Sequence, residues 1–288
     1  MPSDDKVALG VEEALALAAR ALRRVGYDQQ QSDIIAASLV DAELCGYPAL
    51  GLARLVSIIE DPRARHKRTP VTIVHETPVS ALIDGGNNVG LYALHRAAQT
   101  TIDKARATGI VLVGVHNSFF SGRSAHYVEM ISRTGLISIH TTASEPYMAA
   151  LGGTVSELGT NPIAFGFPRD PDPLIVDIGT SAIARSEVVL AARLGKPLPE
   201  GAALDDQGRP TRDAAAALIG TMLPFGGHKG FGLGLMVQAL GLLGGAALPR
   251  GSVQDFGFLF IAFDPGLLMP AEEYRRQLDA LIQRIKAL

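Results

Sequence analysis

The sequence has little cysteine and no excess of positive charge. Cys45 is the single cysteine among 288 residues, which rules out an internal disulfide and any metal cluster built on cysteines. A lone cysteine also fits the reducing cytoplasm, and we predict no metal site. The formal net charge is −3 and the only basic run lies between Arg63 and Arg68, so nucleic acid is not an expected partner.

Long apolar segments are also scarce. The N-terminus carries acidic residues and a lysine before Val7, so no signal peptide is evident. One membrane candidate, Phe231–Leu248, has Gln238 as its only clearly polar residue, but glycines interrupt it and no second span follows. A helix that is apolar all round is also typical of a protein core. We therefore predict a buried helix here and no membrane partner.

What the sequence does have is apolar content, with 47% hydrophobic and 19% charged residues, as in a well-buried globular protein. Its length suits one large domain or two modest ones. Apolar periodicity in the first part predicts helices at Val11–Val25, Ser32–Leu44 and Leu50–Ile59. We predict a helical unit over residues 1–69, packed with a C-terminal helix at 270–288 that turns Leu278, Leu281, Ile282 and Ile285 inward.

From Val71 onward strands and helices alternate, which favours an α/β domain over residues 70–269. The predicted strands are Val71–Val74, Val79–Ile83, Ile110–Val115, Leu136–His140, Ile163–Phe167, Leu174–Val176 and Phe256–Phe263. The predicted helices are Leu91–Ala107, Ser124–Arg133 and Ile183–Leu194. We expect a turn at Asp84–Asn88 and a polar loop at Lys196–Arg212.

A glycine-rich stretch from Pro224 to Leu235 opens the long apolar helix and contains His228, Lys229 and Gly230. A turn of this kind can direct backbone N–H groups to one point, where the helix dipole and the lysine favour an anion such as a cofactor phosphate. The spacing matches neither the Walker loop nor the usual dinucleotide fingerprint. The alternative is a packing turn whose glycines allow close helix contact.

Three further loops carry polar residues. His116–Ser124 follows a predicted strand and opens a helix, which is where α/β proteins hold ligands, although Ser121 and Ser124 could instead cap that helix. Leu158–Pro162 leads into a strand. Val176–Ser181 places Asp177 at the end of a strand, as a site carboxylate or a structural hydrogen-bonding group. Thr180 or Ser181 could cap the next helix.

Together these segments resemble one family. The matching segments, in chain order, are Asp41–Leu55, Ile83-Asp84-Gly85 with Gly90, Val115–Ser118, Gly152-Gly153, Gly159–Pro162, Asp177 with Thr180-Ser181, and Pro224–Gly230. They resemble the type-2 malate/L-lactate dehydrogenase family, which also contains sulfolactate, ureidoglycolate and cyclic imino acid enzymes. The resemblance covers about residues 8 to 286.

The resemblance implies an α/β protein with the malate/L-lactate dehydrogenase type-2 (sulfolactate dehydrogenase-like) fold, not the Rossmann fold. Family members use NAD or NADP and are usually homodimers. The residues that the resemblance places round the cofactor are Gly159, Thr160, Asn161, Pro162, Asp177, Thr180, Ser181, His228, Lys229 and Gly230, and we predict that Ser121 and Gly122 also bind it.

The sequence departs from the family where catalysis is expected. Ala49 and Leu50 stand where the family pattern has serine and histidine, and Phe120 stands where a second active-site histidine is expected. Arg54 survives from that set and could clamp a substrate carboxylate. The chain is also short between Gly245 and Phe256, where the family usually has more residues.

Reducing a ketone by hydride leaves an alkoxide, which needs a proton from a positioned acid. Alanine, leucine and phenylalanine cannot supply it, so the remaining candidate acids are Tyr47, His126 and Asp177, with Arg54 as the substrate clamp. For His126 the alternative is an exposed helix histidine, and for Arg54 a structural ion pair with a carboxylate such as Glu43. We predict an NAD(P)H-dependent reductase acting on the C=N bond of a small carboxylic acid. The alternative is a family member that has lost redox catalysis and serves as a non-redox enzyme or a binding protein.

Overall fold

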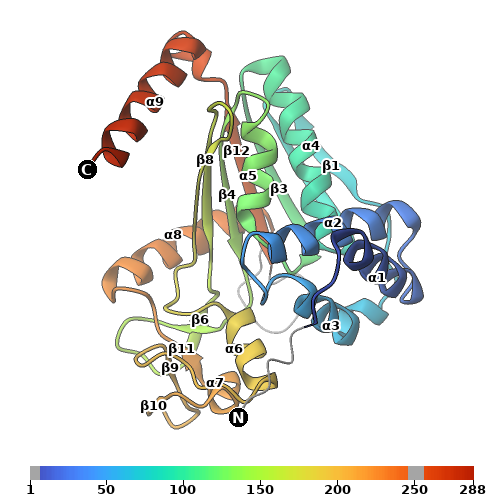
Figure 1. The fold of residues 1–288 in the computed structure, drawn as a ribbon, viewed down its shortest axis with the longest axis vertical. Coiled ribbons are helices and arrows are strands. Elements are labelled where there is room, and N and C mark those ends of the chain that lie inside the picture. Colours follow the sequence, from blue (N-terminus) through green and yellow to red (C-terminus); the bar gives the residue numbers. More distant parts are fainter. Residues whose placement is uncertain (1–6, 246–255) are drawn as a thin grey trace. The chain divides into compact units, whose positions relative to one another are not determined.

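The computed structural model describes residues 7–245 and 256–288. The chain divides into two compact units, Met1–His66 and Lys67–Leu288, and each is considered by itself (Figure 1). The second unit includes the C-terminal helix, so its packing on the helical unit stays a prediction. No helix within the described ranges is both long enough and apolar enough to cross a membrane.

Over its described residues, 7–66, the first unit has three α-helices and a 3₁₀ turn, η1 (Pro62–Arg65). Helix α1 (Val11–Arg24) buries alanines and Leu22 along one face. Helix α2 (Gln29–Leu44) begins before Ser32, where we predicted its start, because Asp28 and Gln31 form a reciprocal capping box. Helix α3 (Leu52–Glu60) begins after Leu50, so the prediction that Leu50 belongs to this helix was wrong. The Glu43 carboxylate accepts a hydrogen bond from Leu52 N at 2.9 Å and thereby caps α3.

The second unit is built on a seven-stranded sheet with the order β1-β2-β3-β12-β4-β7-β8. Its strands are β1 (Thr72–Thr77), β2 (Ser80–Val89), β3 (Ile110–Phe119), β4 (Ile137–Ala143), β7 (Ile163–Phe167), β8 (Leu174–Ile178) and β12 (Gly257–Phe263). Among the described strands of this sheet only β2 and β3 pair in parallel, and helix α4 (Gly90–Thr108) connects them. Helices α4 and α5 (Ser124–Ser132) lie on one face of the sheet (Figure 1).

Two predicted loops are parts of strands. We expected Asp84–Asn88 to be a turn and His116–Phe119 to be a loop, but these segments extend β2 and β3. The pairing slips between Asp84 and Asn88, and side chains satisfy the irregular backbone. Asp84 Oδ1 accepts from Gly86 N at 2.7 Å and from Asn117 Nδ2 at 2.6 Å. The polar residues and glycines of this segment, from which we predicted a turn, instead form a β-bulge that side-chain hydrogen bonds hold in place.

The face of the sheet under α5 is a closed core with a histidine inside it. His140 is fully buried on β4, where its ring stacks on Phe260 at 4.1 Å and lies edge-on to Tyr127 of α5. His140 Nδ1 lies 3.2 Å from the carbonyl oxygen of Leu259. Burial lowers the pKa of His140 to about 3, so the imidazole is neutral at ordinary pH.

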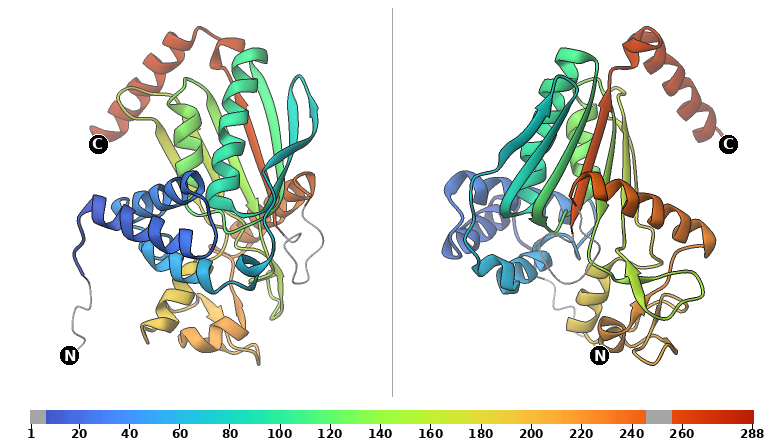
Figure 2. Two further views of the ribbon diagram at one scale, coloured as in Figure 1. Left: turned by 90° about the vertical axis from the view of Figure 1, so that its right-hand side faces the viewer. Right: turned by 180° about the vertical axis from the view of Figure 1, so that it is seen from behind.

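The other face of the sheet is apolar and largely uncovered. The strand register aligns side chains in rows across the sheet, because paired residues of neighbouring strands share a face. One row contains Leu112, Ile261, Ile139, Phe165 and Val176, and the next contains Ile110, Phe263, Ile137, Phe167 and Leu174. Figure 2 (right) shows α8 (His228–Leu243) crossing one end of this face.

Helix α8 is not the fully buried helix that we predicted. Gly241 faces the sheet, since a Cβ there would lie 2.2 Å from the Cβ of Ala143. The leucines point away, and Leu235, Met236, Leu242 and Leu243 are all more than half exposed. Because glycine has no side chain, the helix can approach the strands closely, and its large side chains lie on the opposite side. The last part of the predicted segment, Ala246–Leu248, lies outside the described residues.

A second, five-stranded sheet was missed, and it has the order β10-β9-β11-β5-β6. Its strands are β5 (Met148–Ala149), β6 (Ser156–Leu158), β9 (Ala203–Leu204), β10 (Pro210–Thr211) and β11 (Thr221–Met222). Two of them lie in the stretch Lys196–Arg212 that we predicted to be a loop. Helices α6 (Arg185–Arg193) and α7 (Ala214–Ile219) pack on this sheet round Val188, Ala217 and Met222.

The C-terminal helix α9 (Ala271–Lys286) follows a 3₁₀ turn, η3 (Pro265–Leu267), and has no buried residue. Leu281 and Ile285, which we predicted to point inward, are 44% and 59% exposed. Arg169 anchors the helix to the unit by a hydrogen bond from Nε to Asp279 Oδ1 at 2.5 Å. The apolar face of α9 is therefore open in a single chain.

Candidate functional site

Three of the predicted loops meet in the second unit. Thr180 N donates to the carbonyl oxygen of Thr160 at 2.9 Å, and Phe225 N donates to that of Thr180 at 3.1 Å. An isolated bridge also pairs Ser181 with Pro224. Gly159–Pro162, Asp177–Ser181 and Pro224–Gly230 therefore form one continuous backbone surface, although they are far apart in the sequence.

Several of the predicted site side chains hold this surface together. Asn161 is fully buried, and its Nδ2 donates to the carbonyl oxygen of Gly234 and to Gln238 Oε1, each at 2.9 Å. Thr180 Oγ1 donates to the carbonyl oxygen of Thr160 at 3.0 Å, and Ser181 Oγ to that of Ile183 at 2.7 Å. Neither hydroxyl caps a helix, because Ala184 is the N-cap residue of α6. These side chains fix the shape of the surface.

For the start of α8 the sequence left open an anion-binding turn or a packing turn, and the structure has features of both. Gly230 is a packing glycine, since a Cβ there would lie 2.4 Å from the carbonyl oxygen of Phe225. Gly230 N and Phe231 N donate to carbonyl oxygens of the same turn, at 2.9 and 3.1 Å, so these N–H groups do not gather on an external point as expected. His228 and Lys229 are exposed. Their side chains are the groups of this turn that could meet an anion.

The backbone of this surface is partly free of side-chain cover. A Cβ added to Gly179 would meet nothing within 4 Å, and at Gly226 and Gly227 the nearest atoms would lie at 3.9 Å. By contrast, a Cβ on Gly159 would lie 2.3 Å from Ser144 Oγ, so that glycine serves internal packing. Bare backbone beside an exposed lysine fits an extended ligand that carries phosphate groups, as a nicotinamide dinucleotide does.

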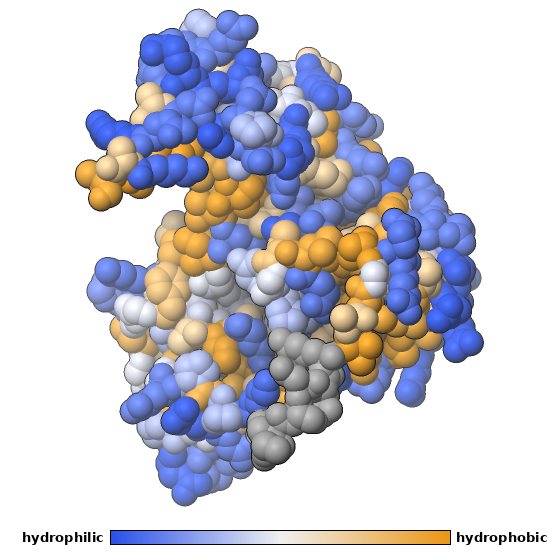
Figure 3. Space-filling model, in the orientation of Figure 1, coloured by the Kyte–Doolittle hydropathy of each residue, from blue (hydrophilic) through white to orange (hydrophobic). Residues whose placement is uncertain are grey.

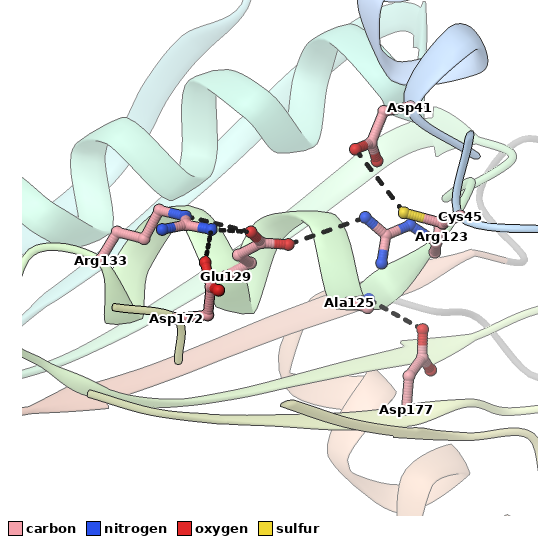
Figure 4. A network of polar contacts seen from close by, with 8 residues as sticks. All are labelled: Asp41, Cys45, Arg123, Ala125, Glu129, Arg133, Asp172 and Asp177. Carbon is pink, nitrogen blue, oxygen red and sulfur yellow. Dashed lines mark hydrogen bonds and ion pairs between the residues drawn. The ribbon is translucent and has the colours of Figure 1, made fainter. Parts of the chain in front are cut away.

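Asp177 lies beside the start of α5 and is not beyond the end of its strand. It pairs with Ala164 within β8, and its Oδ2 accepts a hydrogen bond from Ala125 N at 2.8 Å (Figure 4). Crowding by surrounding protein atoms raises the pKa of Asp177, although this hydrogen bond and the charge of Arg123 act in the opposite direction. The residue as a whole still reaches solvent. A carboxyl group of this kind keeps its proton to higher pH than an ordinary aspartate.

The turn before α5 positions Phe120, Ser121 and Gly122. Phe120 and Gly122 have φ angles of 57° and 72°, and the Tyr127 hydroxyl donates to the carbonyl oxygen of Ser121 at 2.6 Å. Neither Ser121 nor Ser124 caps the helix, because Arg123 is its N-cap residue and no side-chain bond is made there. Arg123 instead lies 3.8 Å from Glu129 of the same helix (Figure 4).

His126 stands in the first turn of α5, one residue beyond the N–H group that binds Asp177. It is partly buried, and its ring lies edge-on to that of Tyr127 at 5.4 Å. Burial lowers the pKa of His95 on α4, and the charges of His126 and Arg96 lower it further. The structure therefore brings His126 and Asp177, two of the candidate acids, to the same end of α5.

The other two candidate catalytic residues belong to the first unit. Tyr47 lies in the turn after α2 and is 52% exposed. Arg54 lies in the first turn of α3, and its charge helps to lower the pKa of Asp61. Burial alone would raise that pKa, but Asp61 is bound by Arg63, with 2.8 Å between Arg63 Nη2 and Asp61 Oδ2. The Asp61 carboxylate is thus bound by Arg63, and the Glu43 carboxylate accepts a hydrogen bond from Leu52 N.

One cluster beside the three loops was missed. Glu145 is bonded to the Tyr147 hydroxyl, and Arg185 lies over the Tyr147 ring, with its Cζ 4.6 Å from the ring centroid. Sequence reasoning had no motif for this arrangement, because the residues come from the segment after β4 and from the start of α6. The available signal was an arginine four residues after Ser181, near the start of a predicted helix.

Known proteins agree with this architecture. A family model described as malate/L-lactate dehydrogenase matches residues 9–288. The chain belongs to the malate/L-lactate dehydrogenase family. It is accordingly an NAD(P)-dependent oxidoreductase with the sulfolactate dehydrogenase-like fold, as the resemblance implied.

Individual family members are similar over nearly the whole chain. The L-sulfolactate dehydrogenase of Methanothermobacter thermautotrophicus is 37% identical, over 96% of this chain and 84% of that protein. A Δ1-pyrroline-2-carboxylate/Δ1-piperideine-2-carboxylate reductase of Pseudomonas aeruginosa is 34% identical, over 97% and 88%. The solved structure of sulfolactate dehydrogenase from Methanocaldococcus jannaschii superposes with a TM-score of 0.82 at 34% identity, covering 97% of this chain and 84% of that one.

Proposed function

We propose that this chain is an NAD(P)H-dependent reductase that acts on the C=N bond of a small carboxylic acid. The observation that carries the proposal is the contrast at the site. The loops proposed for the cofactor are assembled, while Leu50 and Phe120 occupy the positions at which the family resemblance places histidines. A chain that keeps the cofactor loops but lacks the histidines suits a substrate whose reduction needs little protonation by a general acid.

The chemistry explains why the substrate class follows from the missing acids. The bound nicotinamide supplies a hydride to the carbon of the substrate double bond. A ketone becomes an alkoxide and requires a proton from the protein, whereas a protonated iminium becomes a neutral amine directly. The raised pKa of Asp177 makes it the first candidate for proton transfers that remain, with His126 and Tyr47 as the others.

The binding roles are assigned to separate groups. Lys229 and His228 hold a cofactor phosphate, and the surface made by Gly159, Thr160, Asn161, Pro162, Asp177, Thr180, Ser181 and Gly230, with Ser121 and Gly122, accommodates the dinucleotide. Arg54 holds the acidic group of the substrate. The names of the relatives include both sulfolactate dehydrogenases and cyclic imino acid reductases, and the replaced histidines favour the second class.

Cofactor binding separates this proposal from the alternative of a non-redox enzyme or binding protein. We expect the purified chain to quench or shift NADH or NADPH fluorescence on titration, and to melt at a higher temperature when the nucleotide is present. A chain that shows neither effect with either nucleotide would favour the alternative.

We further propose a homodimer formed through the uncovered face of the sheet. The two apolar rows of that face carry no charged side chain, and a contiguous apolar patch on the surface of a monomer commonly marks an interaction site. Val176 and Ile178 of the edge strand are 36% and 39% exposed, and Figure 3 shows apolar surface beside α9 at this edge. A second copy presents the same uncharged face, so the two are self-complementary about a two-fold axis.

Sedimentation tests this assembly. The wild-type chain should sediment at twice its monomer mass of 30.3 kDa, and Leu112→Glu should sediment as a monomer. Ile73→Glu is the matched control, because Ile73 is also exposed but its register with Ile83 places it on the other face. A monomeric wild type, or a Leu112→Glu variant that remains dimeric, would contradict the proposal.

A further inference from the structure

Arg185 occupies an unusual position for a structural arginine. It is the first residue of α6 and is only partly exposed. Its guanidinium lies over the ring of Tyr147, with 4.6 Å between Cζ and the ring centroid, and its Nη2 donates to the carbonyl oxygen of Leu218 at 3.1 Å. The single hydrogen bond uses one N–H of a fork that offers five.

The guanidinium of Arg185 is partly buried and makes no direct ion pair with a described residue. Burial lowers its pKa, and the charges of Tyr147 and Glu145 act in the opposite direction. The Glu145 carboxylate is bonded to the Tyr147 hydroxyl, and no carboxylate within the described ranges lies at ion-pair distance from Arg185. The N-terminal end of α6 adds positive potential at the same place. A positively charged, incompletely satisfied fork of this kind fits an oxyanion.

Backbone hydrogen bonds connect the segments that carry Arg185 and Tyr147 to the proposed cofactor surface. Tyr147 N donates to the carbonyl oxygen of Leu158 at 2.8 Å, directly before Gly159. Met222 N donates to the carbonyl oxygen of Tyr147 at 2.9 Å, and Ala182 N to that of Leu223 at 2.8 Å. The segments that carry Tyr147 and Arg185 are thus hydrogen-bonded to residues directly beside the three loops that carry the proposed cofactor residues.

We infer that Arg185, stacked on Tyr147, is a second anion site that binds an oxyanion of the ligand on these loops. The inference rests on the proposed function. The oxyanion is a phosphate of the cofactor or the carboxylate of the substrate, since a guanidinium fork binds either in the same bidentate manner. Tyr147 is the platform for the guanidinium, and Glu145 fixes the tyrosine, so both are positioning residues.

Binding measurements on one variant distinguish the sources. In Arg185→Met we expect the dissociation constant of the affected probe to rise roughly ten- to hundredfold, as for the loss of a charge-assisted contact. The probes are NADPH, NADH and malonate. An effect on NADPH alone assigns the 2′-phosphate, an effect on both nucleotides assigns the pyrophosphate, and an effect on malonate alone assigns the substrate carboxylate.

Two controls guard against loss of folding. Arg193→Met removes an exposed arginine from the other end of α6 and should leave all three constants unchanged. Arg185→Lys keeps the charge but not the fork, and should weaken the same probe by a smaller factor even where Arg185→Met does not fold.

The possible failures are distinguishable. Wild-type binding that survives both Arg185→Met and Arg185→Lys would overturn the anion site and leave the proposed function intact. A wild-type chain that binds none of the three probes would overturn both.

Discussion

Two groups of segments in this chain have diverged from their family to different degrees. The loops round Thr160, Thr180 and Phe225 form one hydrogen-bonded surface, with glycines where bare backbone or close packing requires them. The segments that should deliver protons carry Ala49, Leu50 and Phe120 instead of polar residues. In our proposal nucleotide binding is kept while proton delivery is reduced, which limits the substrates that can accept a hydride.

The largest effect should come from the substrate clamp. Arg54→Met should raise the KM for an acidic substrate about a hundredfold, because a charge-assisted contact is lost, and should leave NAD(P)H affinity unchanged. Arg63→Met is the matched control, since it removes the ion pair to Asp61 and should affect the Tm and not the KM. If Arg54→Met instead lowers the Tm and spares the KM, Arg54 is a structural arginine.

The next largest effect should fall on the cofactor side. Lys229→Ala should weaken NAD(P)H binding roughly ten- to hundredfold in a fluorescence titration, because the exposed ammonium no longer meets a phosphate. Lys196→Ala removes another exposed lysine, between α6 and β9, and should have no effect. Equal affinities for the wild type and Lys229→Ala would remove the turn before α8 from the cofactor site.

The smallest effect should be on the pH dependence of stability, and it comes from His140, a histidine with a structural role. The pKa of His140 is about 3 in the folded chain and near 6.5 when unfolded, so between these values the unfolded state binds more protons. Wild-type stability should therefore fall by about 1.4 kcal/mol for each pH unit below roughly pH 6. His140→Gln should lose this part of the slope in urea unfolding at several pH values. Identical slopes would contradict the buried neutral state.

Sequence patterns predicted the elements whose signals are local. Strand β7 has the predicted bounds Ile163–Phe167, and α5 differs by one residue, because an apolar run after Pro162 and an apolar periodicity after Gly122 are sufficient signals. The two-residue strands of the second sheet were missed, since so short a strand shows no alternation. Helix α8 was misjudged because hydrophobicity cannot show that Gly241 meets the sheet while Leu242 and Leu243 point to solvent.

In the candidate site, too, some features could be predicted from the sequence and others could not. The motifs round Gly159, Asp177 and Lys229 could be found by their resemblance to one family, and the structure brings their loops together. Contacts between distant segments could not be found, such as Ala125 N to Asp177 or Arg185 over Tyr147. The commitment of Asn161 and Thr180 to internal hydrogen bonds also depends on partners far away in the chain.

The central claim is that the replaced acids select C=N over C=O substrates, and the most direct test compares kcat/KM for a cyclic imino acid and for oxaloacetate. With the same nicotinamide cofactor, the wild type should reduce the imino acid more efficiently by about 10²–10⁴-fold, which is the usual contribution of general acid catalysis. The variant carrying Ala49→Ser, Leu50→His and Phe120→His should narrow that ratio by gaining activity on oxaloacetate. Comparable wild-type rates on both substrates, or a ratio that favours oxaloacetate, would contradict the account.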